Sequence, residues 1–239
     1  MATHRQARTG WLGILVFLGS ALLGIRTCQT EDDGPFAFFP DDALFQVLLD
    51  QGVDRNGDGL ISLREAESVK TLTLPPAGIR SLEGLTVFSR LDSFSMTLNP
   101  MDSASFSALP SLRYLSCTSC ELKHLEVGDN GNLETLIAGR NSLESLDLSG
   151  NGSLRTLVLN NNLFAELDLS HTPLLEKMIS CGNRLPRLDV SMLSGLTLLG
   201  IDNMPMLEEV LVWTLPFPPA GLTVLMEYSP AVQFYLSGD

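Results

Sequence analysis

The sequence predicts a solenoid, in which the chain winds into short stacked coils built mainly of parallel β-strand with little helix. A leucine returns every 21 residues, and an asparagine returns with the same period. The leucines are Leu91, Leu112, Leu133, Leu154, Leu175 and Leu196, and the asparagines are Asn99, Asn141, Asn162 and Asn183. A unit this short cannot bury its own apolar side, so successive coils must stack and share one core.

Composition supports a sizeable core and excludes some partners. The chain has 239 residues, of which 44% are hydrophobic, and its formal net charge is −13. Nucleic-acid binding depends on Lys and Arg that neutralise phosphates, so this charge argues against it. It also argues against adhesion of the folded body to an anionic membrane, and it suits basic partners or divalent cations.

The first residues form an export signal. Arg5 and Arg8 precede an apolar run of 15 residues, 11–25, which is short for a membrane span. The run leads to Cys28, and this arrangement resembles a bacterial lipoprotein signal, in which that cysteine is lipidated. Arg26 and Thr27 depart from the pattern, and an ordinary signal peptide is the alternative. We expect residues 1–27 to be the signal and residues 28–40 a flexible acidic tether.

A candidate calcium loop follows the tether. Oxygen-bearing residues recur through twelve positions, closed by a glutamate, and a glycine stands at the sixth position. The candidate ligands are Asp54, Asn56, Asp58, the carbonyl of Leu60, Ser62 and Glu65. This loop resembles an EF-hand, which implies one Ca²⁺ held by these oxygens. Helical patterns flank it, so residues 41–68 are expected to be an EF-hand-like helical cap. A single loop favours a structural ion, and an Asx-rich turn without an ion is the alternative.

Each repeat divides into two similar halves. Leu154, Leu157, Leu159 and Asn162 give LxxLxLxxN, and Phe164, Leu167 and Leu169 repeat the apolar spacing. The pattern is similar to the bacterial leucine-rich repeats with nested half-repeats, over residues 69–215. The resemblance implies a leucine-rich repeat solenoid and a role in binding or adhesion. Residues 216–239 are expected to cap its end, because open sheet edges need covering.

Two outward rows follow from this register. In the first half-repeat, alternation along a strand exposes Ile137, Val158 and Ile179 in successive coils. We expect the row to end at Leu211, with Tyr114 and Trp213 near its ends. Such a row can mark a partner site, or it can simply stabilise cross-strand packing. In the second half-repeat Glu126, Asp147, Asp168 and Asp189 form an acidic row, which we interpret as structural; ions or a basic partner are the alternative ligands.

Catalysis is not expected. Cys117 and Cys120 form a CxxC spacing, but both fall on expected core positions and no second pair completes a zinc site. His124 and His171 lie outside any nucleophile or metal motif. We therefore predict a non-enzymatic, secreted or outer-membrane surface module that binds a protein, or alternatively a glycan, and meets the membrane only through a lipid anchor. A structural envelope component without a soluble ligand is the competing hypothesis.

Overall fold

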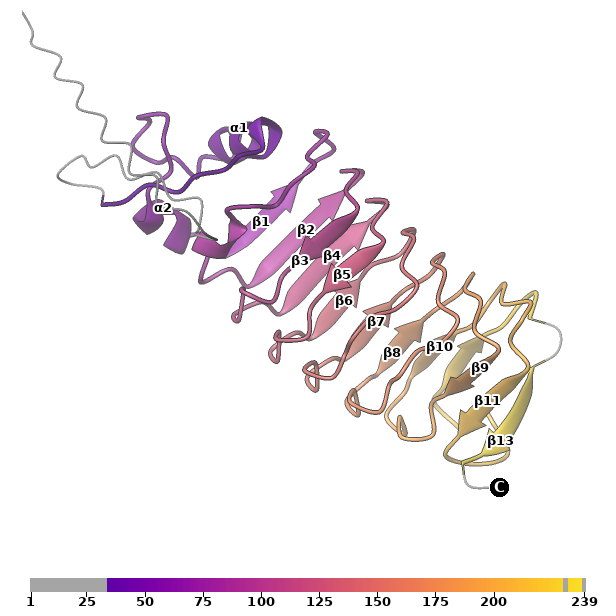
Figure 1. Cartoon of the computed structure of the whole chain (residues 1–239). Helices are drawn as coiled ribbons and strands as arrows, with labels where there is room; N and C mark the ends of the chain where they lie inside the picture. Colours follow the sequence, from indigo (N-terminus) through magenta and orange to yellow (C-terminus); the bar gives the residue numbers. More distant parts are fainter. Residues whose placement is uncertain (1–33, 230–231, 238–239) are drawn as a thin grey trace, which may run out of the picture.

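The computed structural model describes residues 34–229 and 232–237, which form one elongated stack of coils (Figure 1). The predicted signal, the lipidation site Cys28 and the first part of the tether lie outside the described residues. Within the described ranges, no helix is both long enough and apolar enough to cross a membrane.

Two short helices stand at the start of the stack. Helix α1 is Asp42–Asp50, and Asp41 caps it by accepting a hydrogen bond from the Leu44 amide at 2.9 Å. Helix α2 is Leu63–Glu67, and it begins with a capping box between Ser62 and Glu65. Leu44 and Leu48 are fully buried in the same core as the first coils, so α1 is packed onto the stack.

The larger sheet contains eight parallel strands, one from each coil. In spatial order they are β1 (Thr71–Leu74), β2 (Ser93–Thr97), β4 (Tyr114–Thr118), β6 (Thr135–Ile137), β7 (Thr156–Val158), β8 (Lys177–Ile179), β10 (Leu198–Gly200) and β12 (Thr223–Leu225). The pairing keeps the repeat register, since Leu136 pairs with Leu157 and Leu157 with Met178. This confirms the predicted parallel stack with little helix.

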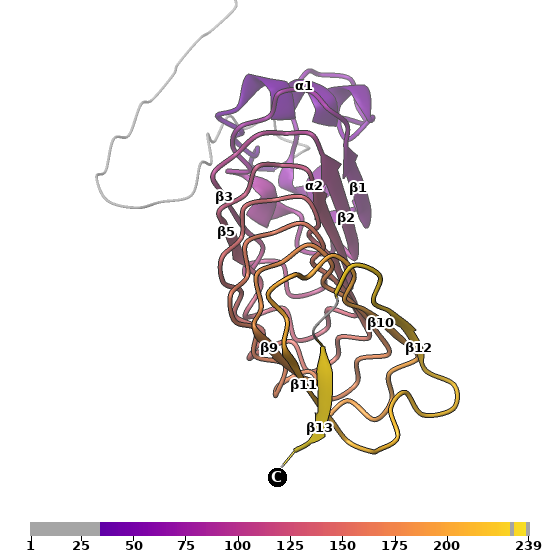
Figure 2. The ribbon, with the colours of Figure 1, turned by 90° about the vertical axis from the view of Figure 1, so that its right-hand side faces the viewer.

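The second half-repeats form the opposite side of the stack, as Figure 2 shows. Two strands pair near its start, β3 (Ser103–Ser105) and β5 (His124–Glu126), and three pair near its end, β9 (Arg187–Asp189), β11 (Glu209–Val212) and β13 (Gln233–Leu236). The coils between these groups run without regular strand on this side, and a 3₁₀ turn, η1 (Leu85–Val87), lies in the first coil.

The core lies between the two sides. The leucines of the grid from Leu91 to Leu196 are all buried, as are most apolar residues that alternate with outward ones along the strands. The periodic asparagines satisfy the backbone of neighbouring coils. Asn162 accepts from the Leu143 amide and donates to the carbonyls of Ala138 and Leu159. Each coil is thereby tied to the one before it by both packing and hydrogen bonds.

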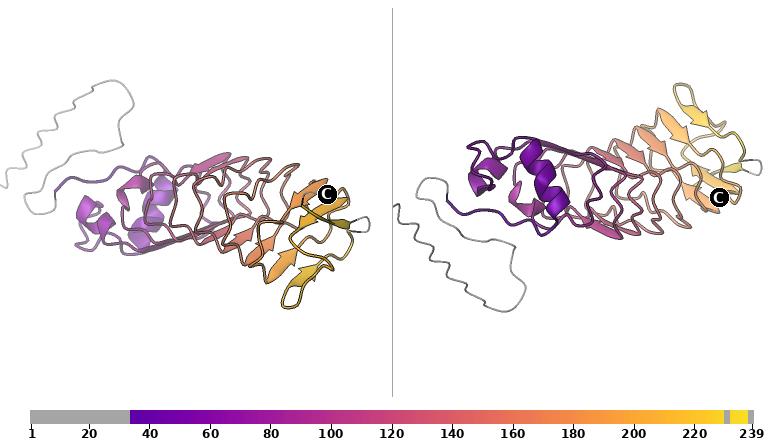
Figure 3. Two further views of the ribbon diagram at one scale, coloured as in Figure 1. Left: turned by 90° about the horizontal axis from the view of Figure 1, so that it is seen from below. Right: turned by 90° about the horizontal axis from the view of Figure 1, so that it is seen from above.

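The last part of the chain extends both sides of the stack. The sequence predicts that the solenoid ends at residue 215 and that residues 216–239 only cap it. In the structure two more strands follow: β12 pairs with β10, and β13 pairs with β11. Residues 223–225 and 233–236 therefore continue the coils, and they are the outermost described strands at this end (Figure 3).

Candidate interaction surface and calcium loop

The predicted aliphatic row is present on the outward side of the eight-stranded sheet. Ile137 pairs with Val158, and Val158 pairs with Ile179, on three adjacent strands. Each side chain is half-buried, whereas the residues directly before and after it are buried. The three side chains thus form one apolar strip across β6, β7 and β8, and we call these three residues the aliphatic row.

The surroundings of the aliphatic row are polar or small. Ser116 precedes Ile137 in the same column, and Gly200 follows Ile179. A Cβ atom at Gly200 would lie 3.1 Å from Cγ2 of Ile179, so a larger residue there would crowd the isoleucine. Tyr114 lies in the neighbouring column, where it pairs with Thr135, and it is 36% exposed. The row is therefore a short apolar island beside one exposed tyrosine.

The structure does not place Leu211 and Trp213 in this row, which corrects the expectation. Leu211 lies in β11 and pairs with Asp189 on one side and with Tyr235 on the other, so it continues the acidic row of the opposite side. The column of the aliphatic row passes instead from Gly200 to Leu225. Trp213 packs edge-on against Phe217, with ring centroids 5.7 Å apart, and contributes to packing near the end of the stack.

Alternating charges lie just before the strands β4, β6, β7 and β8, a feature that we did not predict. Arg113 contacts Glu134 at 2.6 Å, and Arg155 contacts Glu176 at 2.5 Å, each pair spanning neighbouring coils. All four side chains are about half exposed, so each pair contributes little to stability. The signal was present in the sequence as charges of opposite sign that alternate 21 residues apart just before the strands. These residues give the surface a fixed pattern of charge beside its apolar strip.

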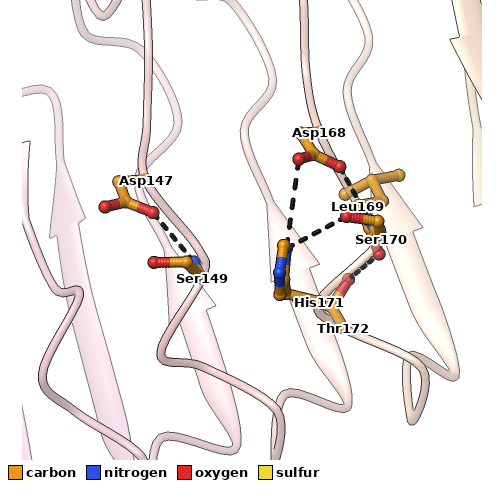
Figure 4. Close-up of polar contacts among 7 residues, drawn as sticks. All are labelled: Asp147, Ser149, Asp168, Leu169, Ser170, His171 and Thr172. Atoms are coloured by element: carbon orange, nitrogen blue, oxygen red, sulfur yellow. Dashed lines mark hydrogen bonds and ion pairs between the residues drawn. The ribbon is translucent and has the colours of Figure 1, made fainter.

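The acidic row has a local structural role. The carboxylates of Asp147 and Asp168 each accept a hydrogen bond of 2.9 Å from the backbone amide two residues later, Ser149 and Ser170 (Figure 4). The hydrogen bonds from these amides, and to a smaller extent those from the serine hydroxyls, lower the pKa of both aspartates. His171 lies between the two rungs, with Nδ1 3.9 Å from Oδ2 of Asp168. The carboxylates are exposed and solvated, and each one stabilises a turn.

In the loop between the two helices, side-chain oxygens accept hydrogen bonds from the backbone amides of the loop. Asp54 accepts from the amides of Gly57 at 2.8 Å and Gly59 at 2.9 Å. Asn56 accepts from the Asp58 amide, and Asp58 accepts from the Leu60 amide. Both glycines have positive φ, 73° and 81°, which favours residues without a Cβ. The oxygen-bearing side chains at alternate positions are thus held close to the loop backbone.

Glu65 joins the two ends of this loop. Its Oε1 accepts from the Arg55 amide at 2.8 Å, and its Oε2 accepts from the amide and hydroxyl of Ser62, also at 2.8 Å. Burial raises the pKa of Glu65, but these hydrogen bonds outweigh it, so the pKa lies below its ordinary value. In the described part of the chain no three His, Cys, Asp or Glu side chains cluster as a metal site. The donors are nevertheless all oxygens, which suits a hard cation such as Ca²⁺.

The cysteines fit the structural interpretation. Cys117 and Cys120 are free and buried, and Cys120 occupies an asparagine position, where its amide donates to Asn141 of the next coil. Burial raises the pKa of both thiols, most strongly for Cys117, which disfavours the reactive thiolate. The two histidines of the solenoid, His124 and His171, are exposed side chains on its surface.

Comparison with solved structures supports the same fold. No protein-family model and no curated protein sequence matches the chain. The crystal structure of internalin C2 from Listeria monocytogenes is similar with a TM-score of 0.60 at 17% identity, covering 82% of this chain and 94% of that one. The leucine-rich repeat protein LIC12759 of Leptospira interrogans gives 0.47 at 18% identity, covering 74% of this chain and 56% of that one. At this identity the similarity to internalin C2 shows the fold alone, and this chain has the fold of a leucine-rich repeat-like parallel β-solenoid.

Proposed function

We propose that the chain is a non-enzymatic binding module that holds a protein partner on the outward side of its eight-stranded sheet. The observation that carries this proposal is the aliphatic row, which presents Ile137, Val158 and Ile179 in register on three adjacent strands. An apolar strip within a polar surface is a common centre for a protein interface. Similarity to internalin C2 supports the fold on which the proposal rests, and the proposal itself depends on the row.

The border of the row supports a protein partner over a purely apolar ligand. The ion pairs of Arg113 with Glu134 and of Arg155 with Glu176 lie directly before the strands of the same sheet, about half exposed. A central apolar strip with a charged rim is the usual composition of a specific interface. Such rim charges contribute mostly to orientation and to the rate of association, while the apolar centre contributes most of the affinity.

Substitution of the row tests this proposal. Val158→Lys with Ile179→Lys should abolish capture of partners that wild-type protein retains from an extract, as identified by mass spectrometry and then titrated as purified proteins. We expect at least about a 100-fold loss of affinity, because burying a charge in an interface costs several kcal/mol. The matched control is Leu174→Lys with Met192→Lys, which places the same charges on exposed apolar residues outside the row.

Two outcomes would contradict the proposal. Equal binding by wild type and the row variant would move the site elsewhere, and the row would then serve only cross-strand packing. Absence of any protein or glycan ligand would favour the alternative, a structural envelope component. Thermal unfolding of both variants must be compared with wild type, since a general loss of folding would also reduce binding.

We also propose that the module is exported and anchored at the bacterial surface by a lipid on Cys28. Support comes from the charged and apolar composition of residues 1–27 and from the acidic residues that follow Cys28. Metabolic labelling with a fatty acid tests this directly. Wild type should incorporate label and partition with outer membranes, whereas Cys28→Ser should do neither. An unlabelled wild-type protein released into the medium would indicate an ordinary signal peptide.

We further propose that the loop of Asp54, Asn56, Asp58, Leu60, Ser62 and Glu65 binds one Ca²⁺ with a structural role. The support is the spacing of its oxygen donors and the two left-handed glycines that bend it. The ion would supply positive charge to a loop that is rich in carboxylates, and it would stiffen the segment that joins α1 and α2.

Calcium addition tests the site through stability. Millimolar Ca²⁺ should raise Tm of wild type by roughly 2 to 8 °C, from about 1 to 2 kcal/mol of linked binding. The shift should vanish in Asp54→Ala with Glu65→Ala. It should persist in Asp129→Ala with Glu144→Ala, which removes two exposed acids elsewhere. An unchanged wild-type Tm would show that the hydrogen bonds of Glu65 close this loop without an ion.

A further inference from the structure

The two ends of the stack differ in how their strand edges are treated. At the N-terminal end, the Gln51 side-chain amide donates to the carbonyl of Thr73 in the first strand, β1. Asp41 accepts from the amides of Arg80 at 2.8 Å and Ser81 at 3.0 Å in the first coil. Helix α1 buries Leu44 and Leu48 in the core of this end. This end is therefore covered by packed side chains and by hydrogen bonds.

At the C-terminal end the outermost strands are open. Strand β12 pairs only with β10, and strand β13 pairs only with β11, among the strands that the structure describes. Neither strand contains an acidic or basic residue, although natural edge strands are commonly protected by charge. The outward backbone edges of both sheets are thus available for pairing at the same end of the molecule.

The side chains of this last coil are unusually apolar for a protein surface. Leu215, Leu225, Met226, Tyr228 and Tyr235 are five of the eleven exposed large hydrophobic residues in the described ranges, with exposures of 37–81%. Between the two strands, Val224 and Phe234 are only partly buried, and Phe217 packs on Phe234 with ring centroids 4.7 Å apart. The core of the solenoid therefore reaches this end without being fully covered by the described residues.

We propose that a second copy of the chain covers this end, so that the protein forms a two-fold symmetric, end-to-end dimer. A two-fold axis perpendicular to the two sheets reverses both the strand direction and the direction of the stack. One rotation therefore places β12 antiparallel to its copy and, at the same time, β13 antiparallel to its copy. The two half-covered cores then meet face to face, and the contact is closed because it uses the same patch on both chains.

Symmetry is what favours a second copy over a different partner. Another protein would need two open strand edges with the same spacing and direction as β12 and β13, and a copy has them necessarily.

Charge is compatible with this contact despite the net charge of −13, because both edge strands are uncharged. If the two copies of β12 pair with Val224 opposite Val224, the nearest acidic residue, Glu227, lies opposite Gly221 of the other chain. Like charges are thereby kept apart.

Sedimentation velocity of the chain that begins at Gly34 tests the dimer, since this chain contains every residue of the core. We expect twice the mass of one chain at micromolar concentration. Leu225→Lys with Tyr235→Lys places four like charges at the joined edges of the dimer, and this variant should sediment as a monomer. The matched control, Tyr114→Lys with Met192→Lys, adds the same charge on exposed residues away from this end and should remain dimeric.

Hydrogen exchange of the unmodified chain provides a measurement that does not depend on any substitution. The amides of Val224 and Phe234 should exchange at least about tenfold more slowly at high than at low protein concentration. Those of β6 should not change with concentration. A monomeric wild type, an assembly larger than a dimer, a dimer that survives the end variant, or concentration-independent exchange in β12 and β13 would each overturn the proposal.

Discussion

Single residues of the asparagine column carry much of the specificity of the stack. Asn162 and Asn183 each hydrogen-bond to three backbone groups, and they share the carbonyl of Leu159 between them. Buried Asn130 and Asn151 donate in the same way, while their Oδ1 atoms have no partner. Asn130 and Asn151 belong to a separate column, in the second half-repeat, where the amides are satisfied only through their N–H groups.

We expect Asn162→Ala to destabilise the protein by about 2 kcal/mol, because the Leu143 N–H is left buried without a partner. The carbonyls of Ala138 and Leu159 each lose one donor and keep another, from Asn141 and Asn183. Urea unfolding followed by circular dichroism measures this change. The control is Asn132→Ala, whose exposed amide makes one hydrogen bond to Pro110, and it should cost less than about 0.5 kcal/mol. A similar decrease in the free energy of unfolding of the two variants would show that the buried amide stabilises the fold no more than the exposed one.

Glycines at close approaches are a second feature at this scale. A Cβ atom added to Gly150 would lie 1.6 Å from the carbonyl oxygen of Gly128 in the previous coil. Glycine at position 150 is therefore required by contact between coils and not by its own backbone angle. The sequence contains no sign of this contact, since the same Asp-Leu-Ser pattern continues in the next coil with His171 in place of glycine.

At the scale of elements, the N-terminal segment depends on two hydrogen-bonded carboxylates. Burial raises the pKa of Asp41, but four backbone amides outweigh it, and the pKa lies below its ordinary value. The same balance holds for Glu65 in the loop before α2. A carboxylate whose pKa is lower in the folded state stabilises the fold above its unfolded pKa, and this stabilisation is lost as pH falls through the folded pKa.

The N-terminal segment should consequently loosen in acid. Between about pH 5 and pH 2 the free energy of unfolding of wild type should decrease more steeply than that of Asp41→Asn, which lacks the titrating group. Urea unfolding at a series of pH values gives both curves. If the curves run parallel, the hydrogen bonds of Asp41 to Leu44, Arg80 and Ser81 do not depend on its charge.

At the scale of the whole molecule, stability arises between neighbouring coils. Each strand of three to five residues pairs only with the strand before it and the strand after it. Such one-dimensional stacks open from their ends, because an end coil has one neighbour and a central coil has two. The binding surface that we propose lies on β6, β7 and β8, in the middle of the sheet.

Hydrogen exchange at low protein concentration should report this gradient. Amides of β6 and β7 should exchange slowest, and those of β12 and β13 fastest, with differences of about tenfold or more between the centre and the open end. Mass spectrometry of peptides or two-dimensional NMR can measure the rates. Uniform protection from Leu72 to Phe234 would show that the stack opens only as a whole.

The prediction that Leu211 lies in the aliphatic row was wrong, and the reason lies in the spacing of the repeats near the end of the stack. Leu207, Val210 and Val212 follow Leu185, Leu188 and Val190 by 22 residues each, so the spacing by itself assigns them to the second half-repeat. Strand β12 could not be found in this way, because Val224 pairs with Leu199, 25 residues earlier, after a proline-rich insertion that interrupts the period.

The sequence by itself determined the stacked coils, their inward leucines and asparagines, and the alignment of Ile137, Val158 and Ile179, because a repeat of constant length places equivalent residues in columns. Only the tertiary structure decided which features lie on the same side of the stack and which strand edges stay open. These depend on contacts between coils and on where each end of the chain folds back, as Gln51 and Asp41 do at one end and no described residue does at the other.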